Sequence, residues 1–279
     1  MEDLRVPVIG VLALQGATEP HLRALAAVGC DAHPVLTPDD LAAADGLVLP
    51  GGESTTMSKL LDANGLRAPL SRSLADDMPA FGTCAGLILL ATDVVDGSAD
   101  LETLGVLDLE VRRNAFGRQV DSFETDLDLP LIEGGPLHAV FIRAPWVERA
   151  GATVEVLGAV DGHPVLVRQG PVLASSFHPE LTVDHRLHGL FAAMVAANVY
   201  LGSGPGETFS GKARAVDGDS LELGGRRVRL YGIDAPELRQ TCEKAGGTTP
   251  CGQRAQAELK FMISGKRVEC ESFGIDRYD

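Results

Sequence analysis

The 279-residue chain has few aromatic residues and no long apolar run, and each absence excludes a class of protein. Aromatic residues make up 5% of the chain and apolar residues 45%, which is typical of a globular protein and excludes disordered and collagen-like chains. No apolar run approaches the roughly 20 residues that cross a bilayer. The start MEDLRVPVIG is acidic where a signal peptide would be basic. We therefore expect a cytoplasmic protein with no membrane partner.

Cysteine is also scarce. The five cysteines, Cys30, Cys84, Cys242, Cys251 and Cys270, are too few and too unevenly spaced for a disulfide framework. This favours a reducing compartment. Cys242 and Cys251 nevertheless lie close enough in the sequence to pair under oxidising conditions.

Basic residues are outnumbered, with 24 Lys and Arg against 39 Asp and Glu, giving a formal net charge of −15. Residues 206–279 hold 12 basic and 12 acidic side chains, so residues 1–205 carry the whole excess of negative charge. Because phosphate binding needs a positive surface, this distribution makes nucleic acid an unlikely partner of the first part. The second part is neutral and does not repel it.

Residues 1–201 alternate short apolar runs with helical patterns, which predicts an α/β domain with a mostly parallel sheet and helices on both faces. The expected strands are 6–14, 31–36, 46–49, 79–81, 106–111, 139–142, 153–160, 164–169 and 172–176. The expected helices are 21–28, 54–61, 87–91 and 185–200.

Residues 202–206, Gly-Ser-Gly-Pro-Gly, have the composition of a flexible linker and coincide with the change in charge. Short strands are expected after it, together with a helix at 251–263, and the region 207–279 is predicted to be a small β-barrel module. The strands are expected at 208–216, 220–223, 226–233 and 267–272.

The segment Gly82-x-Cys84-x-Gly86 lies between an expected strand and an expected helix and has the form of a nucleophile elbow. Small residues permit the tight turn that exposes the central side chain, and a helix N-terminus favours the thiolate of Cys84. A buried structural cysteine is the alternative interpretation.

His178-Pro179-Glu180 follows the last expected strand of the domain. His178 is a candidate base for the thiol of Cys84, and Glu180 is a candidate for orienting its imidazole, as in a thiol triad. A histidine before a proline is more often an ordinary loop residue, but the two motifs together favour catalysis.

Consecutive glycines at Pro50-Gly51-Gly52 occur where a strand meets a helix. Their backbone N–H groups can approach a developing oxyanion, so we expect Gly52 and Ala85 to form an oxyanion hole. Taken alone, Pro-Gly-Gly is an ordinary turn.

Residues 6–200 resemble the PdxT family, the glutaminase subunits of pyridoxal 5′-phosphate synthase. The Cys84 elbow and the His-Pro-Glu motif are shared by class I glutamine amidotransferases in general, whereas segments 113–119 and 121–123 are more specific to this family. The matching segments are 10–16 (GVLALQG), 50–57 (PGGESTTM), 82–91 (GTCAGLILLA), 113–119 (RNAFGRQ), 121–123 (DSF), 141–145 (FIRAP) and 177–181 (FHPEL).

The resemblance implies a three-layer, flavodoxin-like class I glutaminase that hydrolyses L-glutamine to glutamate and ammonia without a cofactor. It implies a hetero-oligomeric complex in which ammonia is channelled to the TIM-barrel synthase subunit, PdxS. A glutaminase that feeds another pathway is the rival within this fold, and segment 113–119 disfavours it.

The resemblance also assigns roles to residues. It makes Cys84 the nucleophile, His178 the general base and acid, and Glu180 its orienting partner. An arginine can clamp the α-carboxylate of glutamine through two hydrogen bonds, and Arg112 is the alternative to Arg113 if the alignment is shifted by one residue. The positions that match those around glutamine are Gly52, Glu53, Ser54, Arg113, Ile142 and Arg143.

The C-terminal region carries three strings that resemble the staphylococcal nuclease family, an OB-fold: 216–220 (VDGDS), 228–237 (VRLYGIDAPE) and 276–278 (DRY). Two carboxylates and an arginine on adjoining strands can hold a divalent cation and a phosphate, although turn aspartates in a solvated hairpin are the alternative. By resemblance, Asp219 and Asp234 are calcium ligands, Arg229 binds phosphate and Glu237 is the general base.

The family pattern continues beyond Asp276-Arg-Tyr into another barrel strand and a second phosphate arginine, which this sequence does not include. We therefore expect an incomplete OB-fold segment without nuclease activity, in which calcium has a role only if the segment is functional. A natural fusion and a gene-boundary artefact both remain open. The alternative function for the chain is nucleic-acid binding or calcium-dependent cleavage by this segment.

Overall fold

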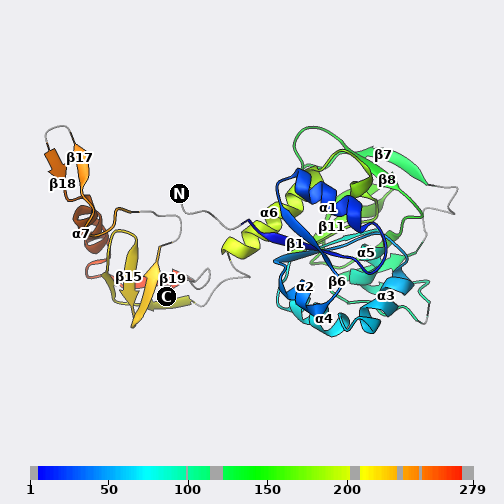
Figure 1. Cartoon of the computed structure of the whole chain (residues 1–279), viewed down its shortest axis with the longest axis horizontal. Helices are drawn as coiled ribbons and strands as arrows, with labels where there is room; N and C mark the ends of the chain where they lie inside the picture. The colour runs from blue at the N-terminus through cyan, green and yellow to red at the C-terminus, as the bar shows by residue number, and fades with distance from the viewer. Residues whose placement is uncertain are drawn as a thin grey trace. The chain divides into compact units, whose positions relative to one another are not determined.

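The computed structural model describes residues 6–98, 100–113, 122–201, 208–230, 235–244 and 247–271. The chain divides into two compact units, Met1–Val199 and Tyr200–Asp279, each of which is described by itself (Figure 1). The expected linker, residues 202–206, lies outside the described residues.

The first unit is built on a seven-stranded sheet with the order β10-β11-β12-β4-β3-β1-β2. Five neighbouring strands, from β12 to β2, are parallel, and β10 and β11 add an antiparallel edge. This confirms the prediction of a mostly parallel sheet. The strands are β1 (Val8–Leu12), β2 (Asp31–Val35), β3 (Gly46–Leu49), β4 (Ala80–Thr83), β10 (Glu155–Val160), β11 (His163–Gln169) and β12 (Val172–Ser175).

Helices cover both faces of this sheet and make three layers. In β3, Leu47 and Leu49 pack into one core cluster and Val48 into the other, because successive side chains of a strand point to opposite faces. One cluster receives α2 (Pro38–Ala42), α3 (Ser54–Ala63), α4 (Arg67–Ala75) and α5 (Ala85–Leu90), and the other receives α1 (Thr18–Ala27) and α6 (Arg186–Leu201) (Figure 1).

Several short elements of this unit were not expected from the sequence. The helix predicted at 87–91 begins earlier, at Ala85, and residue 91 starts a strand instead. Small sheets of order β5-β6-β9 and β7-β8 flank the main one. Their strands are β5 (Ala91–Val94), β6 (Leu107–Arg112), β7 (Phe123–Leu127), β8 (Leu137–Phe141) and β9 (Trp146–Ala150). Of these, β6 and β8 correspond to the strands predicted at 106–111 and 139–142, whereas β5, β7 and β9 were not predicted.

In the described part of the second unit, the strands pair in three small sheets of two, three and two strands. This agrees with an incomplete OB-fold and corrects the simpler expectation of one small barrel. The strand predicted at 208–216 is broken at Lys212, and the one predicted at 226–233 ends at Arg229, while residues 231–233 lie outside the described residues. The strands are β13 (Thr208–Gly211), β14 (Ala213–Ala215), β15 (Ser220–Leu223), β16 (Arg226–Arg229), β17 (Cys242–Lys244), β18 (Gly247–Thr249) and β19 (Val268–Glu271).

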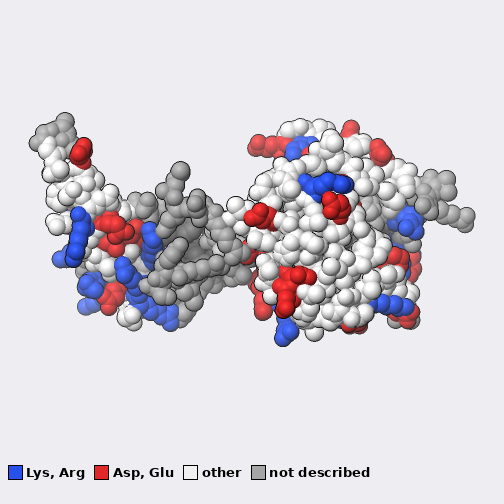
Figure 2. Space-filling view, viewed as in Figure 1, with Lys and Arg blue, Asp and Glu red and all other residues white. Residues whose placement is uncertain are grey.

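The helix of this unit, α7 (Cys251–Ile263), has the predicted bounds. A disulfide joins Cys242 at the start of β17 to Cys251 at the start of α7, the pair whose spacing allows it. Figure 2 shows basic side chains on the visible face of this unit with acidic ones among them. Over the described ranges of both units, no helix is long and apolar enough to cross a membrane.

The packing of α6 on the sheet generates a stability prediction. Phe191 is fully buried, and its ring lies 5.6 Å from that of Phe81 in β4. Phe191→Ala should lower the free energy of unfolding by about 3–5 kcal/mol, because it leaves a cavity in a core that cannot fully collapse. Urea denaturation measures this change. Val183→Ala is the control, since Val183 is 97% exposed; equal effects of the two substitutions would contradict the packing described here.

Candidate active site

Cys84 lies in a tight turn between β4 and α5. Its φ of 49° is in the left-handed region, which costs free energy for any residue with a side chain. The flanking glycines are required by close packing, since a Cβ on Gly86 would lie 2.0 Å from the carbonyl oxygen of Leu49. The Cys84 N–H donates to the carbonyl of Ser175 at the end of β12, 2.8 Å away. The structure therefore has the elbow geometry that the motif predicts.

His178 follows β12 and precedes a short 3-10 helix, Pro179–Leu181. Its Nδ1 lies 2.8 Å from Glu180 Oε1, and Cys84 lies close enough to its ring to raise the pKa of His178. The exposed fractions are 7% for Cys84, 9% for His178 and 6% for Glu180. The structure thus brings the three predicted triad residues together in a nearly dry site.

The charges of this site follow from its contacts. Burial by itself lowers the pKa of His178, but hydrogen bonds and charge interactions with Cys84 and Glu180 outweigh it and raise the pKa to about 10. Burial raises the pKa of Glu180, but the hydrogen bond from His178 and nearby histidines leave it below its usual value. Imidazolium and carboxylate are therefore the stable forms of His178 and Glu180 at neutral pH.

Gly51 lies directly against this triad. A Cβ on Gly51 would fall 2.4 Å from His178 Cε1 and 3.5 Å from Cys84 Cβ. Gln15 holds the turn in place, because its Oε1 accepts a hydrogen bond of 2.7 Å from the N–H of Glu53. Gly51 therefore lies against the triad, and Ala85, the first residue of α5, directly follows the nucleophile, whereas a Cβ on Gly52 would face Gln15 and Met57. The role of Gly52 and Ala85 in an oxyanion hole stays a prediction.

Glu53 begins α3 and organises the predicted glutamine site. Its carboxylate accepts hydrogen bonds from the N–H groups of Thr55 and Thr56, and it pairs with Arg113 at 3.1 Å. Burial raises the pKa of Glu53, but these hydrogen bonds prevail and lower it to about 2. Arg112 instead pairs with Glu148. The arginine beside the candidate site is therefore Arg113.

The remaining predicted binding residues are Ser54, Ile142 and Arg143, and in the described part of the chain no hydrogen bond or ion pair joins them to the triad. Ser54 is 2% exposed, and its hydroxyl has no hydrogen-bond partner among the described residues. Ile142 is half-buried after β8, and the exposed Arg143 has a φ of 45°. Most of the family-specific segment 113–119, together with Asp121, lies outside the described residues.

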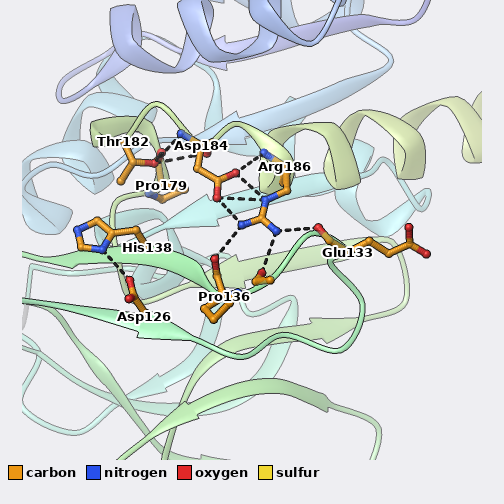
Figure 3. A network of polar contacts seen from close by, with 9 residues as sticks. Asp126, Glu133, Pro136, His138, Pro179, Thr182, Asp184 and Arg186 are labelled. Carbon is orange, nitrogen blue, oxygen red and sulfur yellow. Dashed lines mark hydrogen bonds and ion pairs between the residues drawn. The ribbon is translucent and has the colours of Figure 1, made fainter.

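A polar network that sequence reasoning missed holds the His-Pro-Glu turn (Figure 3). Arg186 pairs with Asp184 at 2.6 Å and also donates to the carbonyls of Glu133 and Pro136, at 2.7 and 2.9 Å. Thr182 accepts a hydrogen bond from the Asp184 N–H. These contacts tie the start of α6 to the loop before β8. The signal in the sequence is the Thr-x-Asp-x-Arg spacing before a helix.

Two buried histidines were also missed. His21 in α1 and His188 in α6 are both fully buried, and His21 Nε2 lies 3.4 Å from Glu180 Oε2. No local motif marks either residue, since the contact joins segments far apart in the sequence.

The nuclease-like residues do not assemble a cation site in the described ranges. The Oδ1 of Asp219 accepts a hydrogen bond from the Ser220 hydroxyl. Its Oδ2 accepts one from the Ala235 N–H and lies 3.7 Å from the Arg229 guanidinium. Glu237 is exposed, and Asp234 lies outside the described residues. No group of three or more metal-ligating side chains occurs in the described part of the chain.

An elbow cysteine with a His-Glu pair, at the carboxyl ends of parallel strands, defines a thiol-dependent acyl-transfer protein of α/β fold. The model of the SNO glutamine amidotransferase family matches residues 11–197, and the chain belongs to this family. This confirms the resemblance given by the motifs. In the C-terminal unit, the staphylococcal nuclease homologue model matches residues 227–279.

The similar proteins agree with this. The chain is 63% identical to the pyridoxal 5′-phosphate synthase subunit PdxT of Acidothermus cellulolyticus, over 68% of this chain and 95% of that protein. It is 56% identical to PdxT of Salinispora arenicola, over 70% of this chain and 100% of that protein. A solved glutamine amidotransferase is 48% identical, with a TM-score of 0.63 over 67% of this chain and 98% of that one. These matches confirm the α/β glutaminase fold of the first unit.

The charge state of His178 is testable. Glu180→Gln removes the anion beside Nδ1, so the pKa of His178 should fall from about 10 towards its ordinary value of 6.5. NMR titration of the imidazole measures it. Glu155→Gln is the control, because Glu155 pairs with Arg168 at the surface.

The sign of the effect on stability follows. Since the folded pKa of His178 is raised, its protonation stabilises the fold fully below pH 6.5, and this contribution is lost as the pH rises through about 10. A His178 titration unaffected by Glu180→Gln would contradict the pairing.

Proposed function

We propose that this chain hydrolyses L-glutamine to L-glutamate and ammonia, with Cys84 as nucleophile, His178 as acid and base, and Glu180 as the residue that orients the imidazole. The observation that carries the proposal is the contact of a strained elbow cysteine with a buried His-Glu pair. Membership of a glutamine amidotransferase family and relatives named PdxT support it.

The charges of the triad suggest the order of steps. The Cys84 thiolate attacks the side-chain amide carbon of glutamine, and the carbonyl oxygen becomes an oxyanion. The His178 imidazolium then gives its proton to the amide nitrogen, and the C–N bond breaks. Ammonia departs, and the glutamyl group stays on Cys84 as a thioester. The neutral imidazole takes a proton from water, which attacks the thioester and releases glutamate. His178 ends protonated and Cys84 ends as thiolate, ready for the next turnover.

The backbone around the triad suits the charge that develops. Ala85 directly follows Cys84, and Gly52 follows Gly51, which packs against His178. The N–H groups of Gly52 and Ala85 are the proposed donors to the oxyanion. Such preorganised donors are each worth on the order of 100-fold to 1000-fold in rate. Each step uses side chains, backbone and water, so we propose that hydrolysis needs no cofactor.

Glutamine itself is proposed to bind beside α3. The guanidinium of Arg113, held by Glu53 and Thr55, suits the α-carboxylate. The ionised Glu53 and the buried hydroxyl of Ser54 are the nearby polar groups, and Gly52, Ile142 and Arg143 complete the proposed set.

The ammonia is proposed to pass to a synthase subunit of the PdxS type, a TIM-barrel protein, within a hetero-oligomeric complex that makes pyridoxal 5′-phosphate. The support is the name of the relatives, which are subunits of pyridoxal 5′-phosphate synthase. Cys84 must stay reduced to act, which supports the cytoplasm as the location.

The test measures glutamate release, with and without a synthase subunit. Cys84→Ala should abolish turnover, and Gly51→Ala should reduce it about 100-fold or more, because its Cβ would lie 2.4 Å from His178 Cε1 and displace the ring. Gly189→Ala is the matched control in α6, where the nearest atom to the new Cβ is 3.8 Å away. Retained turnover in Cys84→Ala would refute the assignment of the nucleophile.

The second unit is proposed to take no part in this reaction and not to act as a nuclease. A stop codon after Leu201 should leave glutamate release unchanged, because a PdxT relative matched over its whole length corresponds to about the first 200 residues. The full chain should not cleave DNA with calcium, since the oxygens of Asp219 already have protein partners. Calcium-dependent cleavage that Arg229→Ala abolishes would overturn this prediction.

A further inference from the structure

Behind the triad, four polar side chains from four elements meet in the core of the first unit. His21 Nδ1 lies 3.0 Å from His188 Nε2, and His21 Nε2 lies 3.2 Å from Thr83 Oγ1 and 3.4 Å from Glu180 Oε2. All four side chains are buried. Glu180 therefore faces His178 with one carboxylate oxygen and His21 with the other.

Both of these histidines are neutral. Burial lowers the pKa of His21 to about 4, although the charge of Glu180 raises it and that of His178 lowers it. Burial, together with interactions with His21 and His185, lowers the pKa of His188 to about 3, although the charge of Glu180 raises it. Each ring thus carries one proton at neutral pH, and its position decides what the ring can donate.

The position of the protons follows from the contacts. His188 Nδ1 is buried and has no hydrogen-bond partner among the residues that the structure describes, so a proton there would be unpaired. On Nε2 the proton has an acceptor, His21 Nδ1. His21 then carries its own proton on Nε2, which points at Glu180 and Thr83.

The carboxylate gives the same answer independently. Glu180 Oε2 is buried and accepts no hydrogen bond of ordinary geometry in the described part of the chain. It lies 3.4 Å from His21 Nε2. A lone pair on that nitrogen would repel the carboxylate, whereas an N–H attracts it.

We propose that His21 is a positioning residue of the active site: its Nε2–H holds the second oxygen of Glu180, and His188 fixes the tautomer that makes this possible. The proposal rests on the glutaminase function proposed above. Thr83 directly precedes Cys84, so His21 contacts the nucleophile's turn and the orienting carboxylate together. The carboxylate is thereby kept with Oε1 against His178.

The experiment compares two substitutions in the full chain. His21→Asn removes the donor near Glu180, and kcat should fall about 10-fold to 100-fold with KM unchanged, since partners behind a site's ligands have effects of this size. His21→Gln carries an amide nitrogen close to the position of Nε2 and should recover most of the loss. The alkaline limb of the pH profile of kcat/KM should move to lower pH in His21→Asn only, because a released Glu180 stabilises the His178 imidazolium less.

Unchanged kcat and pH profile in His21→Asn would overturn the proposal. So would equal losses in the Asn and Gln variants with an unmoved alkaline limb, which indicate a structural role.

If His21→Asn does not fold, as judged by urea denaturation, His188→Leu takes its place. It removes the ring that fixes the tautomer, and should show a smaller loss of kcat with the same shift, whereas an unchanged profile would overturn the proposal. An inactive wild-type chain would instead refute the glutaminase function.

Discussion

The turn at Cys84 is the constraint on which the rest of the site depends. A left-handed residue with a side chain persists only where its surroundings fix it, and here the fixing is done by backbone contacts. Gly86 packs against the carbonyl of Leu49 in the neighbouring strand, and the Cys84 N–H binds Ser175. The same contacts set the distance between the end of β4 and the end of β12, and so between the thiol and His178.

Burial has different outcomes for the pKa values of the three histidines in and behind the site. A buried imidazole alone would lose its proton, as His21 and His188 do. His178 keeps its proton because it lies between Cys84 and Glu180, whose interactions outweigh desolvation. One buried cluster therefore holds one charged histidine and two neutral ones. All three rings are buried, so the difference comes from their partners, and His178 interacts with both Cys84 and Glu180.

The parts of the site that the sequence predicted are those with local signals. The glycines around Cys84 and the His-Pro-Glu string mark their turns within a few residues, and the core strands are continuous apolar runs. His21 and His188 are 167 residues apart, and only the packing of α1 and α6 on one face of the sheet brings them together. β7 was missed because its buried and charged residues alternate at a sheet edge.

The two units differ in how their polar groups are used, which bears on where the activity lies. In the first unit, the polar side chains of the core converge on one carboxylate, Glu180, which joins the triad to the neutral histidines. In the second unit, the buried Asp219 is engaged by its own hairpin and by Arg229, an arrangement that stabilises a turn. A disulfide fastens β17 to α7 there. The described contacts of the second unit thus stabilise its own small sheets, whereas those of the first unit hold His178 and Glu180 beside Cys84.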